Sequence, residues 1–420
     1  MARTTPFHPR TAARCRSFLW KEWNGFAAVR AYDSHSEEEY FAIRHRVGLI
    51  DVSPLCKYDV SGPHAATLLS RVFSRDVEKL GERRVVYGVL VDPRGKVLDD
   101  GTCAHLEGGT FRLCTSERWA WWLERNARGL DVTIEDTTDR YAALALQGPR
   151  AREVLGPLLE VDGAGGARTG FDLGQMPFFR VRRLRIAGKL GWVARTGYTG
   201  DLGYELFVDA ADALPVWDAV AESGTAHGLT PFGLDALDVA RIEAGFILQG
   251  VDYFSSRAAM IEPRRSTPDE IGLGGTVDLE RATPLLGQDQ IVAERARGPA
   301  WDLVGVELDW TEIERLYHSY GLPPHLAPIA CRSAVPVYAE DGRTQVGQVT
   351  SSTWSPLLKR YLALATVRRP YHELGTRLRV EHTVEFERRS VRATVVPRTF
   401  FDPDRKRSTT PRPTNPEVAR

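Results

Sequence analysis

The segment from Arg195 to Val208, RTGYTGDLGYELFV, constrains the fold more than any other part of the chain. Its glycines at positions 197, 200 and 203 predict a tight loop in which the backbone can lie close to a ligand. The loop leads into a strand that is apolar on both faces except at Glu205. The sequence therefore predicts a strand inside the protein that holds one carboxylate.

A carboxylate in that position needs a partner. An unpaired, buried Glu205 would cost several kcal/mol or would be protonated. A structural salt bridge to a nearby arginine would satisfy it. A ligand with a flat edge carrying two donors would satisfy it equally well, in the bidentate way that a guanidinium does. The residues alone leave both interpretations open.

A β-hairpin is predicted over residues 85–106, where two apolar strands flank the turn sequence DPRG. With a four-residue loop, Tyr87 lies directly opposite Asp100, on one face of the hairpin and with Cβ atoms about 5 Å apart. Asp99 then points to the other face. A slip of one residue would exchange the two aspartates.

The chain is long enough to form several domains. We expect an N-terminal arm over residues 1–34, a region of two subdomains over 35–290, and a small β-barrel over 301–400, where short apolar strands alternate with turns. Residues 402–420 are rich in Pro, Thr and Arg, which predicts a disordered tail. The first 20 residues are basic, as in a transit peptide, but they lack an amphipathic stripe, so an ordinary arm is favoured.

The composition of the chain argues against nucleic acid, membranes and structural zinc as partners. Lys plus Arg and Asp plus Glu both total 55, so no net field attracts nucleic acid or an anionic membrane. No apolar run approaches the roughly 20 residues of a membrane helix. The five cysteines are scattered without a CxxC pair, which disfavours disulfides and structural zinc. We expect a cytoplasmic protein that binds neither nucleic acid nor membrane.

Motifs for bound cofactors are absent from the sequence. It contains no HExxH, no GxxxxGK[ST], no GxSxG, and no GxGxxG between a strand and a helix. We therefore expect no metal, flavin, nicotinamide or nucleotide site. A cofactor, if the chemistry needs one, should arrive as a diffusible cosubstrate.

Several motifs, in order along the chain, are similar to those of the glycine cleavage T-protein (aminomethyltransferase) family. RTGYTGDLGYELFV is the most distinctive. The others are Gly48–Ser53, Tyr58–Pro63, Gly95–Asp100, Ala145–Pro149, Gly233–Asp238, Arg241–Gly245, Val346–Ser351, Ser355–Pro356 and Ala363–Ala365. The resemblance implies an α+β fold, a three-domain cloverleaf around a central folate site with a small C-terminal β-barrel, and tetrahydrofolate as cosubstrate.

The resemblance also implies which residues carry the chemistry. Asp100 matches the acidic residue that contacts the reacting end of folate, and Tyr87 matches an aromatic residue beside it. Glu205 matches the carboxylate that holds the pterin ring, whose edge supplies two donors. These matches agree with the hairpin, which independently places Tyr87 near Asp100.

Three further positions match folate-binding residues of the family. Tyr198 matches an aromatic contact in the folate channel. Leu55, where many relatives have methionine, offers an apolar surface to the ring. Arg241 matches a residue near the carboxylate end of folate, although any cation in the last turn of a helix is favoured by the helix dipole.

Two one-carbon reactions fit this resemblance. An aminomethyltransferase takes its group from a lipoyl arm on a carrier protein and makes methylene-tetrahydrofolate. A demethylase moves a methyl group from O, N or S of a small-molecule donor to N5 of tetrahydrofolate. The chain has Leu248-Gln249-Gly250 where relatives have Leu-Tyr-Gly, an unusual stretch at 253–271, and an apparent insertion at 309–326.

These differences fall where we expect the donor side of the site, so the demethylase is favoured. A non-catalytic folate-binding module is a third possibility. It is disfavoured because such a module would not need Asp100 at the reacting end.

Overall fold

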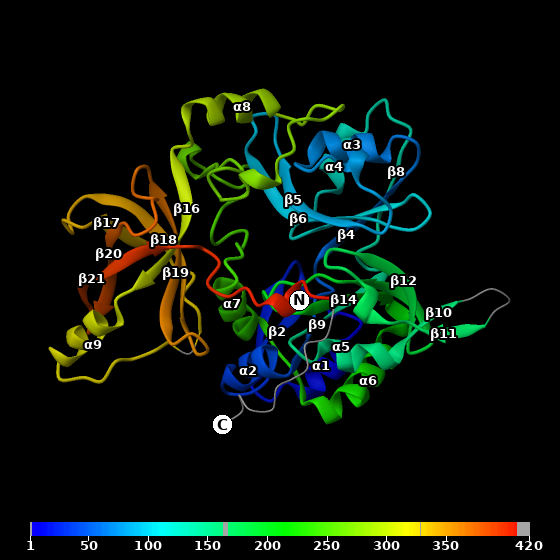
Figure 1. The fold of residues 1–420 in the computed structure, drawn as a ribbon, viewed down its shortest axis with the longest axis horizontal. Coiled ribbons are helices and arrows are strands. Elements are labelled where there is room, and N and C mark those ends of the chain that lie inside the picture. The colour runs from blue at the N-terminus through cyan, green and yellow to red at the C-terminus, as the bar shows by residue number, and fades with distance from the viewer. Residues whose placement is uncertain (1, 163–166, 328, 410–420) are drawn as a thin grey trace.

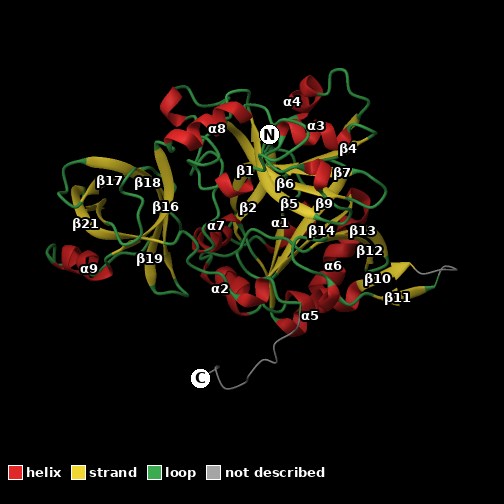
Figure 2. Ribbon diagram, turned by 45° about the horizontal axis from the view of Figure 1, so that its top comes forward, coloured by secondary structure: helices red, strands yellow, loops and turns green. Residues whose placement is uncertain are grey.

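Three lobes surround the centre of the molecule in the computed structural model, which describes residues 2–162, 167–327 and 329–409 (Figure 1). Helices and strands are mixed in two of the lobes, and the third is a barrel (Figure 2). The predicted α+β cloverleaf with a C-terminal barrel is confirmed. In the described part of the chain, no helix is long and apolar enough to cross a membrane.

The first lobe is built on a mixed sheet of eight strands. In spatial order these are β11 (Arg168–Gly170), β10 (Leu159–Asp162), β12 (Val181–Ile186), β13 (Lys189–Ala194), β14 (Gly203–Asp209), β9 (Tyr141–Gln147), β3 (Val47–Asp51) and β15 (Leu229–Pro231). Among the described strands of this sheet, only β15 pairs in parallel, with β3. The glycine-rich loop thus leads into an interior strand, β14, as predicted.

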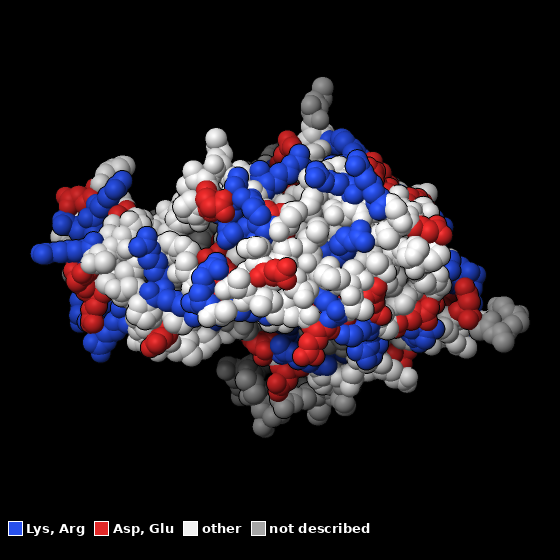
Figure 3. Space-filling model, turned by 90° about the horizontal axis from the view of Figure 1, so that it is seen from above, with Lys and Arg blue, Asp and Glu red and all other residues white. Residues whose placement is uncertain are grey.

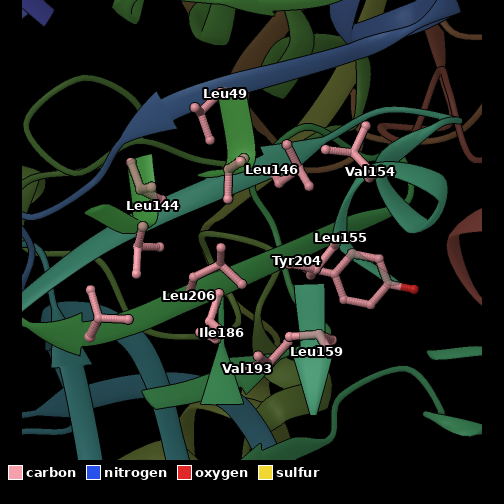
Figure 4. Close-up of a cluster of buried hydrophobic side chains, with 14 of the residues drawn as sticks. Leu49, Leu144, Leu146, Val154, Leu155, Leu159, Ile186, Val193, Tyr204 and Leu206 are labelled. Carbon is pink, nitrogen blue, oxygen red and sulfur yellow. The ribbon is translucent and has the colours of Figure 1, made fainter. Parts of the chain in front are cut away.

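Helices cover both faces of this sheet, because β9 and its neighbours are apolar on both sides. Leu144 and Leu146 pack in one cluster with α5 (Ala151–Leu155), α6 (Ala213–Gly224) and Phe7, the residue before α1 (His8–Arg14), as Figure 4 shows in part. Ala143 and Ala145 face α2 (Glu37–His45) and α7 (Leu234–Glu243). This alternation is the period of two expected for a strand.

The second lobe is a sheet of five strands with helices on one face. Its strands, in spatial order, are β5 (Val85–Val91), β6 (Val97–His105), β7 (Phe111–Thr115), β4 (Cys56–Ser61) and β8 (Thr133–Asp136). Helices α3 (Ala65–Val72) and α4 (Ala120–Asn126) bury Tyr58, Cys103 and Leu113 on that face. The other face of the sheet is turned towards the first lobe.

The third lobe is a closed barrel of six strands. They are β16 (Trp301–Leu308), β19 (Arg360–Arg368), β18 (Gln345–Ser355), β17 (Val335–Ala339), β20 (Arg377–Val384) and β21 (Glu387–Val396). Helix α8 (Gln288–Arg297) precedes the barrel, and α9 (Trp310–His318) packs on it through Ile313, at the end away from α7 (Figure 1). The expectation that residues 309–326 cover the donor side stays a prediction.

Both ends of the described chain dock on the first lobe. The expected N-terminal arm forms α1 and the hairpin β1 (Leu19–Trp23) and β2 (Phe26–Ala31), and Phe7 is fully buried with its ring 5.8 Å from that of Trp217. At the other end, the backbone N–H groups of Phe400 and Phe401 donate to the carbonyl oxygen of Glu243, at 2.9 and 2.8 Å.

The predicted disordered tail is wrong for residues 402–409. The Arg405 guanidinium forms two bonds of 2.7 Å with the carboxylate of buried Asp201, and Arg195 donates to the carbonyl oxygen of Lys406 at 3.0 Å. These ion pairs and hydrogen bonds offset the low apolar content of the segment. Residues 410–420 lie outside the described part of the chain.

Candidate functional site

Tyr87 and Asp100 meet on one face of the β5–β6 hairpin. The strands pair Tyr87 with Thr102 and Val89 with Asp100, so the predicted direct opposition of Tyr87 and Asp100 is wrong by two positions. The reason is a loop shorter than four residues followed by a β-bulge. A shift of two keeps both side chains on one face, and the Tyr87 hydroxyl donates to Oδ2 of Asp100 at 2.7 Å.

Asp100 has a second tyrosine partner that the sequence reasoning missed. Tyr253, buried in the connection after α7, donates its hydroxyl to Oδ1 of Asp100 at 2.5 Å. Burial raises the pKa of Asp100, and the hydrogen bonds from Tyr253 and Tyr87 act against that rise. The only signal in the sequence was that Tyr253 begins the stretch that differs from the relatives.

The side chain of Asp99 lies on the opposite face of the same strand. One of its oxygens accepts from the Ser116 hydroxyl and the N–H of Asp100, and the other accepts from the N–H of Glu117 and the indole of Trp119. Burial, and after it the charge of Asp100, raises the pKa of Asp99 to about 7. Asp99 therefore fixes β6 to the start of α4, away from Asp100's partners.

A polar row crosses the inner face of the five-stranded sheet. Lys57 lies opposite Cys114, Cys114 opposite Thr102, and Thr102 opposite Tyr87. Directly opposed residues share a face, and Asp100, two residues from Thr102, lies on it as well. This face is the one turned away from the core under α3 and α4.

Glu205 approaches this row from the first lobe. Burial raises the pKa of Cys114, and the carboxylate of Glu205 adds to the rise. Burial also raises the pKa of Glu205, and the charge of Lys57 acts against that rise. Because Lys57 and Cys114 stand in the same row as Tyr87, the carboxylates of Glu205 and Asp100 border one interface between the two sheets.

The surroundings of Glu205 fit a ligand edge better than a salt bridge. In the described chain its carboxylate has no ion pair, and the Thr196 hydroxyl is its hydrogen-bond donor. Burial is the main influence on its pKa, which is raised. A carboxylate with one hydroxyl donor can still accept two parallel donors, which is what the edge of a pterin ring presents.

Leu55 and Tyr198 border the same interface. The Leu55 carbonyl accepts from Nζ of Lys57 at 2.8 Å, which places it next to the cation that acts on Glu205. The Tyr198 ring stacks on Phe246, with centroids 5.6 Å apart. Burial raises the pKa of Tyr198, and the carboxylate of Asp100 adds to the rise.

Arg241 is committed to contacts within the protein. It is 1% exposed, and its guanidinium donates to Asp238 at 2.7 Å, to Asp252 at 2.5 Å and to the Ser351 hydroxyl at 2.8 Å. These bonds join α7 to strand β18 of the barrel. The structure thus places Arg241 in the framework beside Tyr198 and not among the groups open to a ligand.

A cavity of about 1070 Å³ opens beside this interface. Its wall includes Tyr87, Phe178, Phe179 and Val277. Within the described chain, Tyr87 is the one predicted site residue on that wall, and Asp100 lies behind its hydroxyl. The cavity therefore reaches Tyr87, the residue whose hydroxyl donates to Asp100.

Comparison with known proteins identifies two family domains in this chain. The GCVT N-terminal domain matches residues 7–281, and the glycine cleavage T-protein C-terminal barrel domain matches residues 321–402. The crystal structure of glycine cleavage system aminomethyltransferase T from Bartonella henselae aligns with a TM-score of 0.77 and 22% identity, covering 96% of this chain and 99% of that one. At this identity the likeness concerns the fold.

Two curated relatives show the range of names in the family. The trimethylamine-oxide aldolase of Ruegeria pomeroyi is 34% identical over 97% of this chain, which spans only 48% of that protein. The aminomethyltransferase of Symbiobacterium thermophilum is 33% identical over 87% of this chain and 88% of its own length. The chain is an enzyme of the glycine cleavage T-protein (aminomethyltransferase) family, whose members transfer one-carbon units with tetrahydrofolate as cosubstrate.

Proposed function

We propose that this enzyme is a demethylase that moves a methyl group from a small O-, N- or S-methylated substrate to N5 of tetrahydrofolate. The observation that carries the proposal is the position of Tyr253. This residue begins the stretch at 253–271 that differs from the aminomethyltransferases, and its hydroxyl holds Asp100 at 2.5 Å. A stretch that we expect on the donor side thus contacts Asp100, the residue matched to the reacting end.

The names of the relatives give a second support. The trimethylamine-oxide aldolase is named after a methylated nitrogen compound, and it aligns with 97% of this chain. Because the chain spans about half of that protein, its complete activity is not transferred here.

Different residues of the chain would bind the cosubstrate and accept its proton. Glu205 accepts the donor edge of the pterin, and Leu55 and Tyr198 border the ring. Tetrahydrofolate supplies the nucleophilic nitrogen N5. Asp100 takes the proton that leaves N5 as the carbon–nitrogen bond forms, while the bond from the methyl carbon to its old heteroatom breaks and the electron pair stays on that atom.

The remaining contribution is alignment. Tyr87 and Tyr253 hold both oxygens of Asp100, so the acceptor is fixed before the substrate arrives. Fixed geometry of reacting groups is worth effective molarities of about 10⁵ M or more in good cases. A leaving oxygen or neutral amine would also need a proton, whereas a sulfonium or quaternary ammonium donor would not.

The aminomethyltransferase reaction is the second candidate. It is favoured by the Symbiobacterium relative and by the probable aminomethyltransferase of Haloarcula marismortui, 35% identical over 81% of this chain and 85% of its own length. In that reaction the partner would be a lipoyl carrier protein instead of a small methyl donor.

A product assay separates the candidates. The protein is incubated with tetrahydrofolate and a panel of methylated oxygen, nitrogen and sulfur compounds, and separately with an aminomethylated lipoyl protein. Mass spectrometry then distinguishes methyl- from methylene-tetrahydrofolate. Methyl-tetrahydrofolate from a small donor is expected. Methylene-tetrahydrofolate as the product would overturn methyl transfer, and bound folate without any product would favour a non-catalytic module.

A further inference from the structure

Lys57 brings a positive charge into the interface between the first two lobes. The residue is 0% exposed, and its Nζ donates to the carbonyl oxygens of Ser53 at 2.9 Å and of Leu55 at 2.8 Å. An ammonium group has three N–H donors, and in the described part of the chain the third has no acceptor. The turn over residues 53–55 thus holds the ammonium group in place without neutralising it.

Stability of the fold does not explain this lysine. A buried charge without an ion-pair partner is unfavourable, and burial lowers the pKa of Lys57 for that reason. On the surface, as on the face in Figure 3, basic and acidic side chains are interspersed and remain in water. Three other buried cations each have a carboxylate partner; they are Arg44, Arg112 and Arg241. Lys57 has no such partner within the described residues, and an apolar side chain would fill its place at lower cost.

Glu205 faces Lys57 from the first lobe. The contact that shows this joins Phe207 of β14 to Arg112 of β7, whose guanidinium carbon lies 5.7 Å from the centre of the ring. Glu205 lies two residues before Phe207, and Cys114 lies two residues after Arg112, so each shares a face with its neighbour. Cys114 is directly opposite Lys57 in the sheet. The carboxylate and the ammonium group therefore lie on facing surfaces of the two sheets.

The other titratable groups around this pair, Asp51 excepted, are paired or uncharged at neutral pH. The guanidinium of Arg112 is held by the carboxylate of Asp59 through two hydrogen bonds of 2.7 Å. Burial raises the pKa of the Cys56 thiol and that of the Cys114 thiol, so both stay protonated. The carboxylate of Asp51 acts on the lysine, whose pKa it raises. Burial raises the pKa of the glutamate, and the charge of the lysine acts against this rise.

The ionisation state of Glu205 decides what the side chain can bind. The edge of a pterin ring presents two donors, and a carboxylate accepts both. A protonated carboxyl group carries a hydrogen on one oxygen, which then points a donor at a donor. This mode of binding therefore requires an ionised Glu205 in a place where burial alone favours protonation.

We propose that Lys57 is a positioning residue for the cosubstrate: its ammonium group keeps Glu205 ionised and so ready to accept the two donors of the pterin edge. The inference rests on the proposed binding of the pterin by Glu205. It adds to that proposal a residue of the second lobe that acts through the carboxylate of the first.

Calorimetric titration with tetrahydrofolate from pH 5 to pH 8 tests the proposal. Lys57→Gln retains a donor for the carbonyl oxygens of the turn and removes the charge. Loss of the charge raises the pKa of Glu205, so the variant should lose folate binding at a higher pH than the unaltered protein does. We expect about tenfold weaker binding at pH 6, and a difference that narrows towards pH 8.

Further variants separate the charge from the structure. In Glu205→Gln there is no ionisation to maintain, so adding Lys57→Gln should change the affinity by less than about twofold. Lys57→Met, which is unbranched and of similar length, should give the same shift of the pH profile if Lys57→Gln does not fold. The matched control is Lys189→Gln, which removes a partly exposed lysine paired with Asp212 at 2.7 Å and should leave the pH profile unchanged.

Equal pH profiles for Lys57→Gln and the unaltered protein would overturn the role of the lysine alone. The same tenfold loss in the Glu205→Gln background would also overturn it, because the lysine would then act without the glutamate. Failure of the unaltered protein to bind tetrahydrofolate, or normal binding by Glu205→Gln, would instead overturn the binding of the pterin by Glu205, and the role of Lys57 with it.

Discussion

The hydroxyl of Tyr253 lies 2.5 Å from Oδ1 of Asp100, although 153 residues separate the two in the chain. Together with Tyr87 on Oδ2, it leaves Asp100 with a donor on each oxygen. The orientation of the carboxylate is thus set jointly by the second lobe and by the connection that leads to the barrel.

Replacing Tyr253 with Phe should impair turnover more than binding. Loss of one hydrogen bond to the carboxylate raises the pKa of Asp100 further, so the acidic limb of the kcat/KM profile should move to higher pH. We expect a loss of about 10- to 100-fold in kcat. Tyr338→Phe, in strand β17, is the control, because its hydroxyl is remote from Asp100. An unchanged pH profile for Tyr253→Phe would contradict the assigned role.

The two adjacent aspartates should respond differently to amidation. Asp100→Asn should retain folate binding while single-turnover rates fall about 10²- to 10⁴-fold, because proton transfer is lost. Asp99→Asn should instead destabilise the fold by about 1–3 kcal/mol, since its amide nitrogen would meet two donors, and the folded fraction should still turn over. The reverse pattern would mean that the catalytic assignment belongs to Asp99.

Glu205→Gln should weaken tetrahydrofolate binding by about 1.5–3 kcal/mol, which is about 10- to 150-fold in Kd. Without ligand, the variant should be the more stable protein at neutral pH. The folded-state pKa of Glu205 is raised, so the charged form opposes folding above the ordinary Glu pKa of about 4.3 and has no effect well below it.

Thermal melts from pH 4 to pH 8 test this sign, because the advantage of the Glu205→Gln variant should grow as pH rises. Glu124→Gln, an exposed change on α4, controls for loss of charge alone. A variant that loses stability but binds folate normally would favour the structural salt bridge.

Arg405→Ala should destabilise the protein by about 1–3 kcal/mol, because it removes the bidentate partner of buried Asp201. Arg44, at 3.8 Å from that carboxylate, would remain as a more distant ion-pair partner. Arg407→Ala, whose side chain is more than half exposed and pairs with Asp402, should change the melting temperature little. Equal melting temperatures for the two variants would argue that the docking of residues 402–409 is weak.

Local sequence predicted much of this molecule. The loop from Arg195 into the strand with Glu205, and the strands of the barrel, follow from patterns within a few residues of each other. The hairpin was predicted with the correct face but the wrong register, because a β-bulge beside the turn leaves no clear mark in the sequence. The alternation of apolar residues decides which face of the hairpin a side chain lies on, whereas the loop decides which residues of the two strands are paired.

The features that the sequence did not predict depend on contacts between residues far apart in the chain. Nothing near Tyr253 in the sequence shows that it reaches Asp100, and nothing near Arg405 shows that it pairs with Asp201, 204 residues away. The composition of residues 402–409 suggested disorder because these residues are polar and charged. The acidic partner of Arg405 lies elsewhere in the chain, so the composition of the segment does not reveal the ion pair. Arg241 was matched to folate, yet its neighbours in space commit it to the barrel junction.

The hydrogen bonds from Phe400 and Phe401 to Glu243 tie together the two points where the chain leaves and rejoins the first lobe. The segment between these two points, which includes the whole barrel, is therefore fixed to the first lobe at both of its ends. A barrel held in this way cannot swing outward without also breaking the hydrogen bonds that join Arg241 and Asp252 to Ser351 in strand β18. We therefore expect the barrel to keep its position on the first lobe when a ligand binds, and any rearrangement to occur in the connection that carries Tyr253.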